Sequence, residues 1–279
     1  MNIEISLCIS FYNNIPWLEM IFEALKKQTF SNFEVIIADD GSNTETVSLL
    51  NDLIKKQPFK ITHLWHSDNG FRKNIILNRA IEISKSAYLV FIDGDCIPHH
   101  KFLEEHYKYR KLNRIVSGRR VELPKKYSNT LTTQKIKSKT FILNLLYHTI
   151  IQTFCNKTRH AENIIRITNP ILRKIFLKQR CKNVLGCNFG VYKSDILKIN
   201  GFDERYINPG TGEDTDIEYR LQRIGVTPIV IKHLLTVYHR NHSRLNIQNK
   251  PNQLIFDDNN KNKISWTPFG IIKNEINIS

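Results

Sequence analysis

The sequence predicts an α/β protein with a mostly parallel central sheet and helices on both faces. Strand and helix patterns alternate through the first hundred residues, as expected when each strand is followed by a crossover helix. The expected strands include nearly unbroken apolar runs, such as "YLVFI" at 88–92, which are typical of strands covered on both faces. A chain of 279 residues, 41% of them hydrophobic, can bury a substantial core.

The first elements follow from these patterns. Strands are expected at 4–10, 60–66 and 88–92, with a strand-to-loop unit at 33–42. A helix at 14–28 begins near Pro16 and carries a line of apolar residues on one face, namely Trp17, Leu18, Ile21, Phe22 and Leu25. The helix after residue 42 has Val47, Leu50 and Ile54 on one face, and a third helix is expected at 72–84.

The pattern changes after one further expected strand at 114–123. Residues 125–182 are rich in Lys, Thr and Ile with helical periodicity, which predicts a basic helical insertion. Regular α/β signals resume near 184, with a helix ending at Gly225 and short strands at 226–231 and 235–239. We therefore expect one domain over 1–240, interrupted at 125–182. The last 39 residues, 241–279, contain nine Asn and predict a loose extension.

The positive charge is concentrated in the insertion. Residues 125–182 contain 13 Lys and Arg against one acid, Glu162, so this segment carries +12 of the total +15. A local basic block indicates an anionic partner, which could be nucleic acid, acidic lipid or an anionic glycan. Its aromatic residues lie mostly in an apolar run and are not interleaved with Lys and Arg, which argues against nucleic acid.

The compartment is predicted from three features. The amino-terminal residues have no basic segment followed by an apolar core, so we expect no signal peptide. Five Cys without metal-type spacing indicate free thiols in a reducing cytosol. The uncharged run 141–155 is too short to span a bilayer. It could lie in the interface, which predicts a peripheral protein on the cytoplasmic face of the inner membrane, or it could pack its apolar side on the domain.

Two carboxylates follow the strand at 88–92. Asp93 and Asp95 lie just past its carboxyl end, where open α/β sheets bind ligands. Residues i and i+2 of a strand point the same way, so both side chains could converge on one cation. The alternative is a tight turn, which Asp-Gly favours without any ligand.

Five motifs in order carry a resemblance to a known family. They are "SFYNN", "VIIADDGS", "DNGFRKNIILNRAI", "FIDGDCIP" and "NPGTGEDTDIEYR". The series, over 3–123 and 184–240, resembles the inverting family 2 glycosyltransferases with the GT-A fold. It is most similar to members with a galactosyltransferase-type C-terminal half, such as bacterial chondroitin polymerase modules. The resemblance implies transfer of a hexose from a UDP-sugar to a hydroxyl of a bacterial surface glycan, either lipopolysaccharide or capsule.

The resemblance also implies roles for the donor-binding residues. Asp40 would accept the imide N–H of uracil with Asp39 supporting it, although an acid here could instead cap the following helix. Phe11 and Tyr12 would lie near the base or ribose, with core packing as the alternative. The remaining donor-side residues are Asp68, Arg72, Asn78 and Arg79, for whose arginines surface ion pairs are the alternative.

For catalysis, the resemblance implies a metal ion and a base. Asp95 would bind Mn²⁺ or Mg²⁺, with Asp93 beside the metal and ribose and His239 as a further ligand; His242 is the second histidine candidate. Asp214 would deprotonate the acceptor, and Glu213 would orient a sugar. Acidic capping of a helix is the alternative for this pair. A nucleic-acid-binding protein and an inactive sugar-nucleotide binder are the rival functions.

Overall fold

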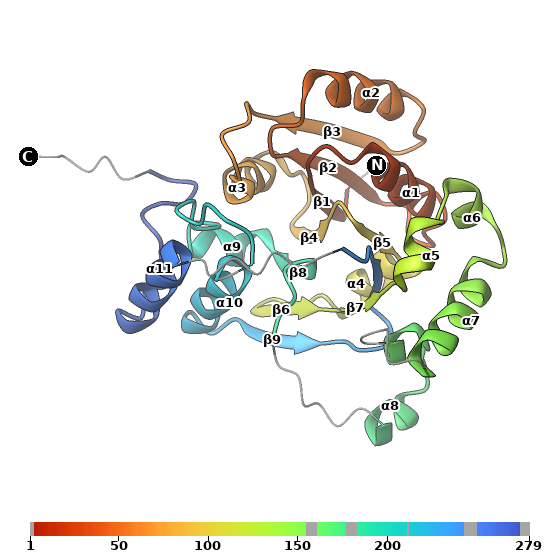
Figure 1. The fold of residues 1–279 in the computed structure, drawn as a ribbon. Coiled ribbons are helices and arrows are strands. Elements are labelled where there is room, and N and C mark those ends of the chain that lie inside the picture. The colour runs from red at the N-terminus through yellow and green to blue at the C-terminus, as the bar shows by residue number, and fades with distance from the viewer. Residues whose placement is uncertain (1–2, 155–160, 177–182, 211, 243–249, 274–279) are drawn as a thin grey trace, which may run out of the picture.

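The central sheet has the predicted, mostly parallel architecture. The computed structural model describes residues 3–154, 161–176, 183–210, 212–242 and 250–273. Seven strands are ordered β3-β2-β1-β4-β8-β6-β9, and only β8 runs antiparallel to its neighbours (Figure 1). The strands are β1 (Ile5–Phe11), β2 (Phe33–Asp39), β3 (Lys60–Trp65), β4 (Tyr88–Asp93), β6 (Arg114–Ser117), β8 (Asn188–Tyr192) and β9 (Thr227–Val230).

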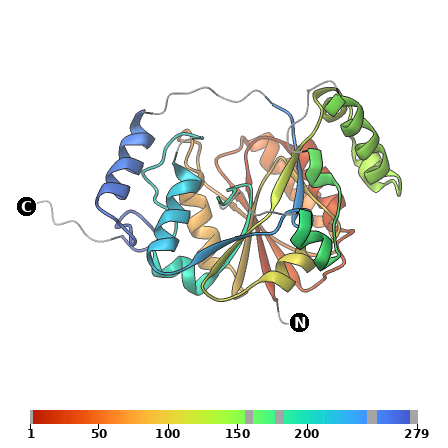
Figure 2. The ribbon, with the colours of Figure 1, turned by 90° about the horizontal axis from the view of Figure 1, so that it is seen from below.

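Helices cover both faces of this sheet, as predicted. In β4, Tyr88, Val90 and Ile92 point into one core cluster, and Leu89 and Phe91 point into the other. The first cluster is covered by α1 (Ile15–Leu25), α2 (Thr44–Lys55) and α4 (Phe102–Tyr109). The second is covered by α3 (Lys73–Ile83), α9 (Lys193–Lys198) and α10 (Glu213–Arg223), so Figure 2 shows helices on either side of the strands.

The single strand expected at 114–123 is wrong, because the chain breaks into two strands at Gly118. A Cβ at Gly118 would lie 2.1 Å from the Leu235 carbonyl oxygen, so no larger residue fits this crossing. The chain then leaves the central sheet as β7 (Arg119–Glu122). It joins a three-stranded sheet ordered β5-β10-β7, with β5 at Cys96–Pro98 and β10 at Thr236–His239. This small sheet positions part of the candidate site.

The insertion is helical, as predicted, and its inner side belongs to the main core. Its helices are α5 (Lys125–Asn129), α6 (Thr133–Lys137), α7 (Phe141–Phe154) and α8 (Pro170–Phe176), with a short 3₁₀ helix at Ala161–Ile164. The core contribution comes from Tyr127, Leu131, Ile136, Phe141 and Leu145. This side of the insertion therefore packs on the domain and does not face a membrane.

The C-terminal segment is packed where the structure describes it, contrary to the loose extension expected over 241–279. Helix α11 (Lys250–Lys261) lies against α10, and the chain after it folds back along the domain (Figure 1). Asn259 Nδ2 donates to Asp216 Oδ1 at 2.8 Å, and Asn200 Nδ2 donates to the Thr267 carbonyl oxygen at 2.7 Å. The many asparagines predicted a loose segment, because Asn is common in loops. A buried Asn can also donate and accept hydrogen bonds within a packed fold, as it does here.

A buried arginine holds α10 against the loop after α9. Arg220 is 0% exposed and its Nε donates to Asp216 Oδ2 at 2.6 Å. Its NH1 group donates to the carbonyl oxygens of Ile199 and Gly201, each at 2.9 Å. A buried ion pair of this kind is costly to break, because the remaining partner keeps an uncompensated charge.

We predict that Arg220→Ala lowers the free energy of unfolding by roughly 3–5 kcal/mol, since Asp216 would lose its counter-charge. Urea denaturation followed by circular dichroism measures this change. Lys55→Ala is the control, because the Lys55–Asp52 pair is 75% and 62% exposed; it should change stability much less than Arg220→Ala does. Equal losses for the two variants would contradict the role of Arg220.

Candidate active site

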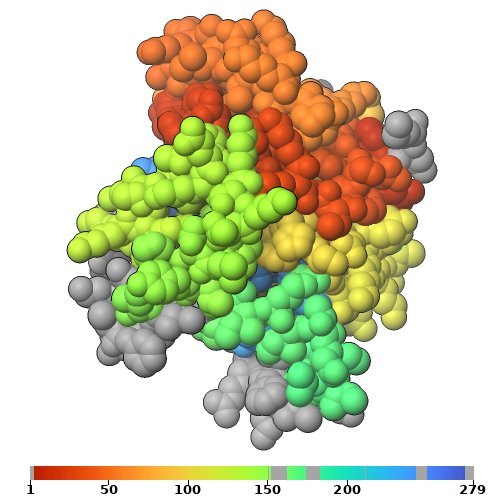
Figure 3. Space-filling model, turned by 90° about the vertical axis from the view of Figure 1, so that its right-hand side faces the viewer, coloured from red at the N-terminus to blue at the C-terminus, as the bar shows by residue number. Residues whose placement is uncertain are grey.

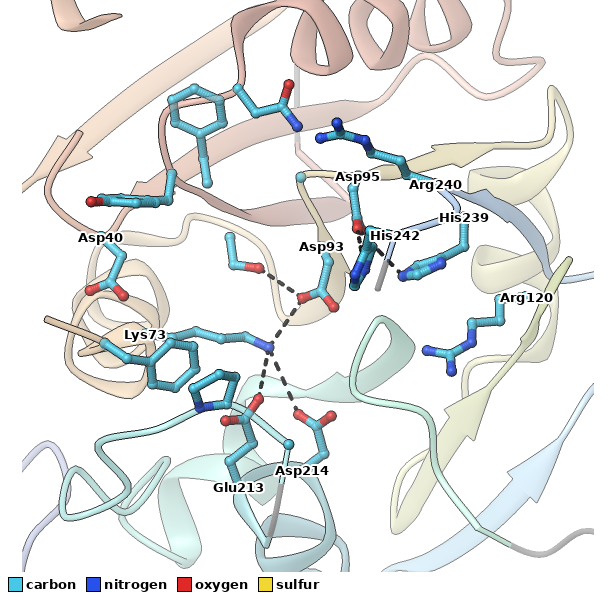
Figure 4. Close-up of a pocket in the computed structure, with 18 of the residues that line it drawn as sticks. Asp40, Lys73, Asp93, Asp95, Arg120, Glu213, Asp214, His239, Arg240 and His242 are labelled. Carbon is cyan, nitrogen blue, oxygen red and sulfur yellow. Dashed lines mark hydrogen bonds and ion pairs between the residues drawn. The ribbon is translucent and has the colours of Figure 1, made fainter. Parts of the chain in front are cut away.

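A cavity of about 1430 Å³ opens at the carboxyl ends of the central strands. Residues from both halves of the chain line it, and Figure 4 shows how their side chains converge. The predicted site residues in this lining are Phe11, Tyr12, Asp40, Asp68, Asp93, Asp95, Glu213, Asp214, His239 and His242. The structure thus brings together ten residues that the sequence spreads over more than 200 positions.

A lysine that the sequence reading missed lies at the centre of the cavity. Lys73 Nζ is 3.1 Å from Asp93 Oδ1, 3.4 Å from Glu213 Oε1 and 3.9 Å from Asp214 Oδ1 (Figure 4). Burial alone favours the neutral amine, but these three carboxylates raise the pKa of Lys73 well above its ordinary value. Lys73 therefore carries a positive charge that joins β4, α3 and α10.

The two acids of the "GED" motif begin α10. Gly212 precedes them at φ 86°, a conformation that favours glycine, and the helix starts at Glu213. A Cβ on Gly186 would lie 1.8 Å from Asp214 Cγ, so Gly186 leaves the space that this carboxylate occupies. The Gly186 backbone also hydrogen-bonds to Asp214. The sequence reading missed Gly186, since nothing local marks it as a neighbour of Asp214.

Burial changes the protonation of these acids. It raises the pKa of Glu213 to about 7, against the opposing charge of Lys73. Desolvation likewise raises the pKa of Asp214, and Lys73 again opposes the shift. Asp216, the third acid of this helical turn, is 2% exposed and paired with Arg220, so it is not available as a base.

Asp95 lies with two histidines on the other side of the cavity. Its Oδ2 is 3.4 Å from His239 Nε2 and 3.3 Å from His242 Nε2. The pairing of β5 with β10 sets His239 opposite Cys96, and the Arg240 backbone N–H donates to the Asp95 carbonyl oxygen at 3.0 Å. Strand register thus brings together residues that are far apart in the sequence.

These residues could hold a divalent ion. The ligand atoms of Asp95, Cys96 and His239 lie within 4.8 Å of one another. His239 Nδ1 is buried and finds no hydrogen-bond partner among the residues described. A carboxylate with imidazoles fits a transition ion such as Mn²⁺ better than Mg²⁺, which prefers oxygen ligands. His242 lies as close to Asp95 as His239 does, so both predicted histidines belong to this group.

Asp93 and Asp95 do not converge on one point, contrary to the strand-based expectation. β4 ends at Asp93 and the chain turns at Gly94, so Asp95 no longer follows the strand alternation. Asp93 Oδ1 accepts a hydrogen bond from Ser10 Oγ at 2.8 Å and pairs with Lys73, whereas Asp95 faces the histidines (Figure 4). The simple turn alternative does not account for these two sets of partners.

Asp40 lies at a third side of the cavity. Its carboxylate accepts hydrogen bonds from His66 Nε2 at 2.8 Å and from the Arg72 backbone N–H at 2.9 Å. Burial raises the pKa of Asp40, while these two contacts oppose the shift. Asp40 does not cap the following helix, because Asn43 accepts the capping bond from the Thr46 N–H at 2.8 Å.

Two aromatic residues beside Asp40 differ in exposure. Tyr12 is 52% exposed and its hydroxyl donates to Asp68 Oδ2 at 2.9 Å. Phe11 is 3% exposed and packs in the first core cluster, although it is also among the residues that line the cavity. Tyr12 and Asp68 therefore offer polar groups to a ligand, and Phe11 mainly supports the wall.

Four predicted donor residues lie outside the cavity lining. Asp39 is fully buried and accepts hydrogen bonds from the Ser42 N–H at 2.8 Å and from His63 Nε2 at 2.9 Å. Asn78 is buried against the Phe202 backbone, to which its side chain donates at 2.9 Å. The Arg72 guanidinium donates to the Phe71 carbonyl oxygen, and Arg79 is exposed on α3. Of the cations in the motif "DNGFRKNIILNRAI", Lys73 is the one that lines the cavity.

Comparison with protein families assigns the fold. Residues 6–168 match the model for glycosyl transferase family 2. The chain belongs to glycosyl transferase family 2. Residues 169–243 of this glycosyltransferase also match a model described as the N-terminal domain of galactosyltransferase. Both matches confirm the resemblance found in the sequence motifs.

Individual relatives agree with this assignment. A chondroitin synthase from Pasteurella multocida is 23% identical over 229 residues, which is 79% of this chain and 23% of that protein. A structure of TarS from S. aureus aligns with a TM-score of 0.56 at 14% identity, covering 85% of this chain and 37% of that one. A mannosyltransferase from Pyrobaculum calidifontis, in complex with GDP-Man and Mn²⁺, aligns with a TM-score of 0.55 at 16% identity, covering 87% and 58%. These structures support the GT-A-like α/β fold.

The family 2 chain spans about 20% of the length of the first curated relatives that it matches. What the chain shares with these longer proteins is a glycosyltransferase unit. The shared fold therefore does not assign to this chain the complete activities or the partners of those longer proteins.

The raised pKa of Glu213 gives a prediction about stability. Its folded-state pKa of about 7 lies above the ordinary 4.5, so the folded protein keeps a proton that the unfolded chain releases between these pH values. Stability from this group is therefore present below pH 4.5 and lost as the pH rises through about 7. Glu213→Gln should match the wild type at pH 4 and be more stable by roughly 1–3 kcal/mol at pH 8.

Urea denaturation at the two pH values, with chelator present, tests this expectation. Glu45→Gln is the matched control, since Glu45 is an exposed acid in the first turn of α2. If Glu213→Gln changed stability equally at both pH values, the protonation account would be wrong.

Proposed function

We propose that this family 2 glycosyltransferase moves a hexose from a UDP-sugar to a hydroxyl of a bacterial surface glycan, using a divalent metal ion and inverting the sugar configuration. The observation that carries the proposal is the division of the cavity into three groups. Asp40 lies at one side, the Asp95–histidine group lies at a second, and Glu213 with Asp214 faces Asp93 across Lys73 (Figure 4).

The nucleoside part of the donor would bind at the side formed by Asp40, Tyr12 and Asp68. The Asp40 carboxylate can accept the imide N–H of uracil, because its two donors, His66 Nε2 and the Arg72 N–H, leave lone pairs free. The exposed face of Tyr12 offers a surface for the base or ribose. This arrangement supports a uridine nucleotide, with galactose, N-acetylgalactosamine or glucose as the expected sugars.

The donor diphosphate would lie between this side and Asp95. Asp95 and His239 belong to a group that could hold a divalent ion, and His242 Nε2 lies 3.3 Å from Asp95 Oδ2. The similar mannosyltransferase structure contains Mn²⁺. When bound, the ion would supply positive charge to the departing UDP. Arg240 lines the same part of the cavity and adds a cation there.

The acceptor hydroxyl would approach Asp214. A general base must be ionised before it takes a proton. Desolvation raises the pKa of Asp214, and the nearby charge of Lys73 opposes this shift and so favours the ionised form. Glu213, on the same helical turn, would hold a sugar hydroxyl. Attack from the Asp214 side, opposite the departing UDP, is a single displacement and gives inversion.

The acceptor class rests on the relatives. The matched chondroitin synthase makes a polysaccharide, and it aligns over 79% of this chain. We therefore propose a growing glycan of lipopolysaccharide or capsule as the acceptor. A panel of nucleotide sugars assayed with Mn²⁺ for hydrolysis and transfer would identify the donor.

We predict that Asp95→Ala abolishes Mn²⁺-dependent UDP binding, because the ion would lose its carboxylate ligand and the diphosphate its counter-charge. Calorimetric titration of UDP with and without Mn²⁺ measures this effect. Asp52→Ala, which removes an exposed acid on α2, is the control and should bind like the wild type. Wild-type UDP affinity that is the same with and without Mn²⁺ would exclude the metal assignment.

Asp214→Asn should bind UDP-sugar normally and slow transfer by roughly 10²–10⁴, the usual contribution of a positioned base. Single-turnover transfer from the donor found in the panel separates this effect from binding. Transfer at the wild-type rate would exclude Asp214 as the base. UDP binding without transfer in the wild type would instead favour an inactive sugar-nucleotide binder.

A further inference from the structure

Helix α7 presents a line of large apolar side chains to solvent. Leu143, Tyr147 and Ile151 are 66%, 63% and 44% exposed, and their spacing of four residues sets them along one side of the helix. The opposite side, with Phe141 and Leu145, is buried in the main core. The outer line is therefore not needed to hold α7 on the domain.

Further apolar side chains are exposed in the next part of the insertion. Ile165, Ile171 and Leu172 are 56%, 67% and 44% exposed. Figures 1 and 3 show α7 and α8 on the same side of the molecule. Six of the 17 exposed large hydrophobic residues in the described ranges thus fall within this segment, so it is richer in exposed apolar side chains than the rest of the described chain.

The same segment is strongly cationic. Lys125, Lys126 and Lys139 are exposed, and Lys139 lies two residues before α7. Glu162 is the only acid between residues 125 and 182, which together carry +12. Large aliphatic and tyrosine side chains beside lysines are the composition of helices that lie in a membrane interface.

We propose that this surface, defined by Leu143, Tyr147, Ile151 and the flanking Lys125, Lys126 and Lys139, docks on an anionic lipid bilayer. The apolar side chains enter the head-group boundary, and the lysines contact acidic head groups. A second copy of the chain is a poorer occupant, because pairing the same surface would bring two segments of +12 together. No helix in the described ranges is long and apolar enough to cross a bilayer.

The buried side of α7, opposite the docking surface, packs next to the candidate metal group. The Phe141 ring packs edge-on against Tyr238 with ring centres 5.8 Å apart, and Tyr238 precedes His239 on β10. The Asn241 N–H donates to Ser128 Oγ of α5 at 3.3 Å. A bilayer bound at α7 would therefore lie on the side of the molecule that carries β10. The inference does not depend on the sugar or acceptor proposed above.

Vesicle flotation of the full chain tests the proposal. Vesicles of phosphatidylcholine with 30% phosphatidylglycerol should bind the protein, and pure phosphatidylcholine should not. Leu143→Ser/Tyr147→Ser/Ile151→Ser should weaken binding at least tenfold. Lys125→Gln/Lys126→Gln/Lys139→Gln should weaken it roughly 100-fold at low salt, since each lysine near an acidic leaflet contributes a factor of about five.

Leu254→Ser is the matched control, because Leu254 is 70% exposed on α11, on the opposite side of the molecule (Figure 1). Its vesicle binding should equal that of the wild type. Melting curves and UDP calorimetry report whether each variant is folded, and they keep this test separate from that of the proposed function.

Equal binding to neutral and acidic vesicles would overturn the proposal. Unchanged binding of either folded triple variant would also overturn it. A wild-type dimer that the apolar triple variant converts to a monomer, without vesicle binding by either, would assign the surface to self-association instead.

Discussion

The arrangement of the site depends on one cation held among three carboxylates. Lys73 comes from the start of α3, Asp93 from the end of β4, and Glu213 and Asp214 from the start of α10. Without this charge, three acids in a desolvated cavity would repel one another and take up protons. Lys73 thereby opposes the rise in pKa that burial causes in Glu213 and Asp214, and it holds these acids close to the end of a strand from the first half of the chain.

A second constraint is the small sheet beside the main one. Gly118 lets the chain leave β6 and enter β7, and β10 then lies between β5 and β7. This register sets His239 beside Asp95, so the candidate metal ligands depend on a strand exchange and not on a local motif. The two acids of "DGD" consequently serve different parts of the cavity.

Local patterns predicted the features that local physics determines. Apolar runs predicted the central strands, helical periodicity predicted α1 to α3, and polar residues after the strands predicted Asp40, Asp93 and Asp95 in the cavity. The sequence motif predicted Arg72, and not Lys73, as the cation of the site. The two residues are adjacent in the sequence, and only the folded structure shows that Lys73 is the one that lines the cavity. Gly186 and α11 were missed because their roles come from contacts across the fold: Gly186 makes room for Asp214, and Asn259 binds Asp216.

The hydrogen bond between Asp216 and Asn259 joins residues 43 positions apart. A ribosome releases the chain from its amino end, so Asp216 emerges well before the residue that completes its hydrogen bonds. The helix that begins with Glu213 and Asp214 therefore reaches its final packing only after Asn259 has emerged, when every strand of the main sheet has already been released. Final ordering of α10 would thus follow the release of the sheet that it covers.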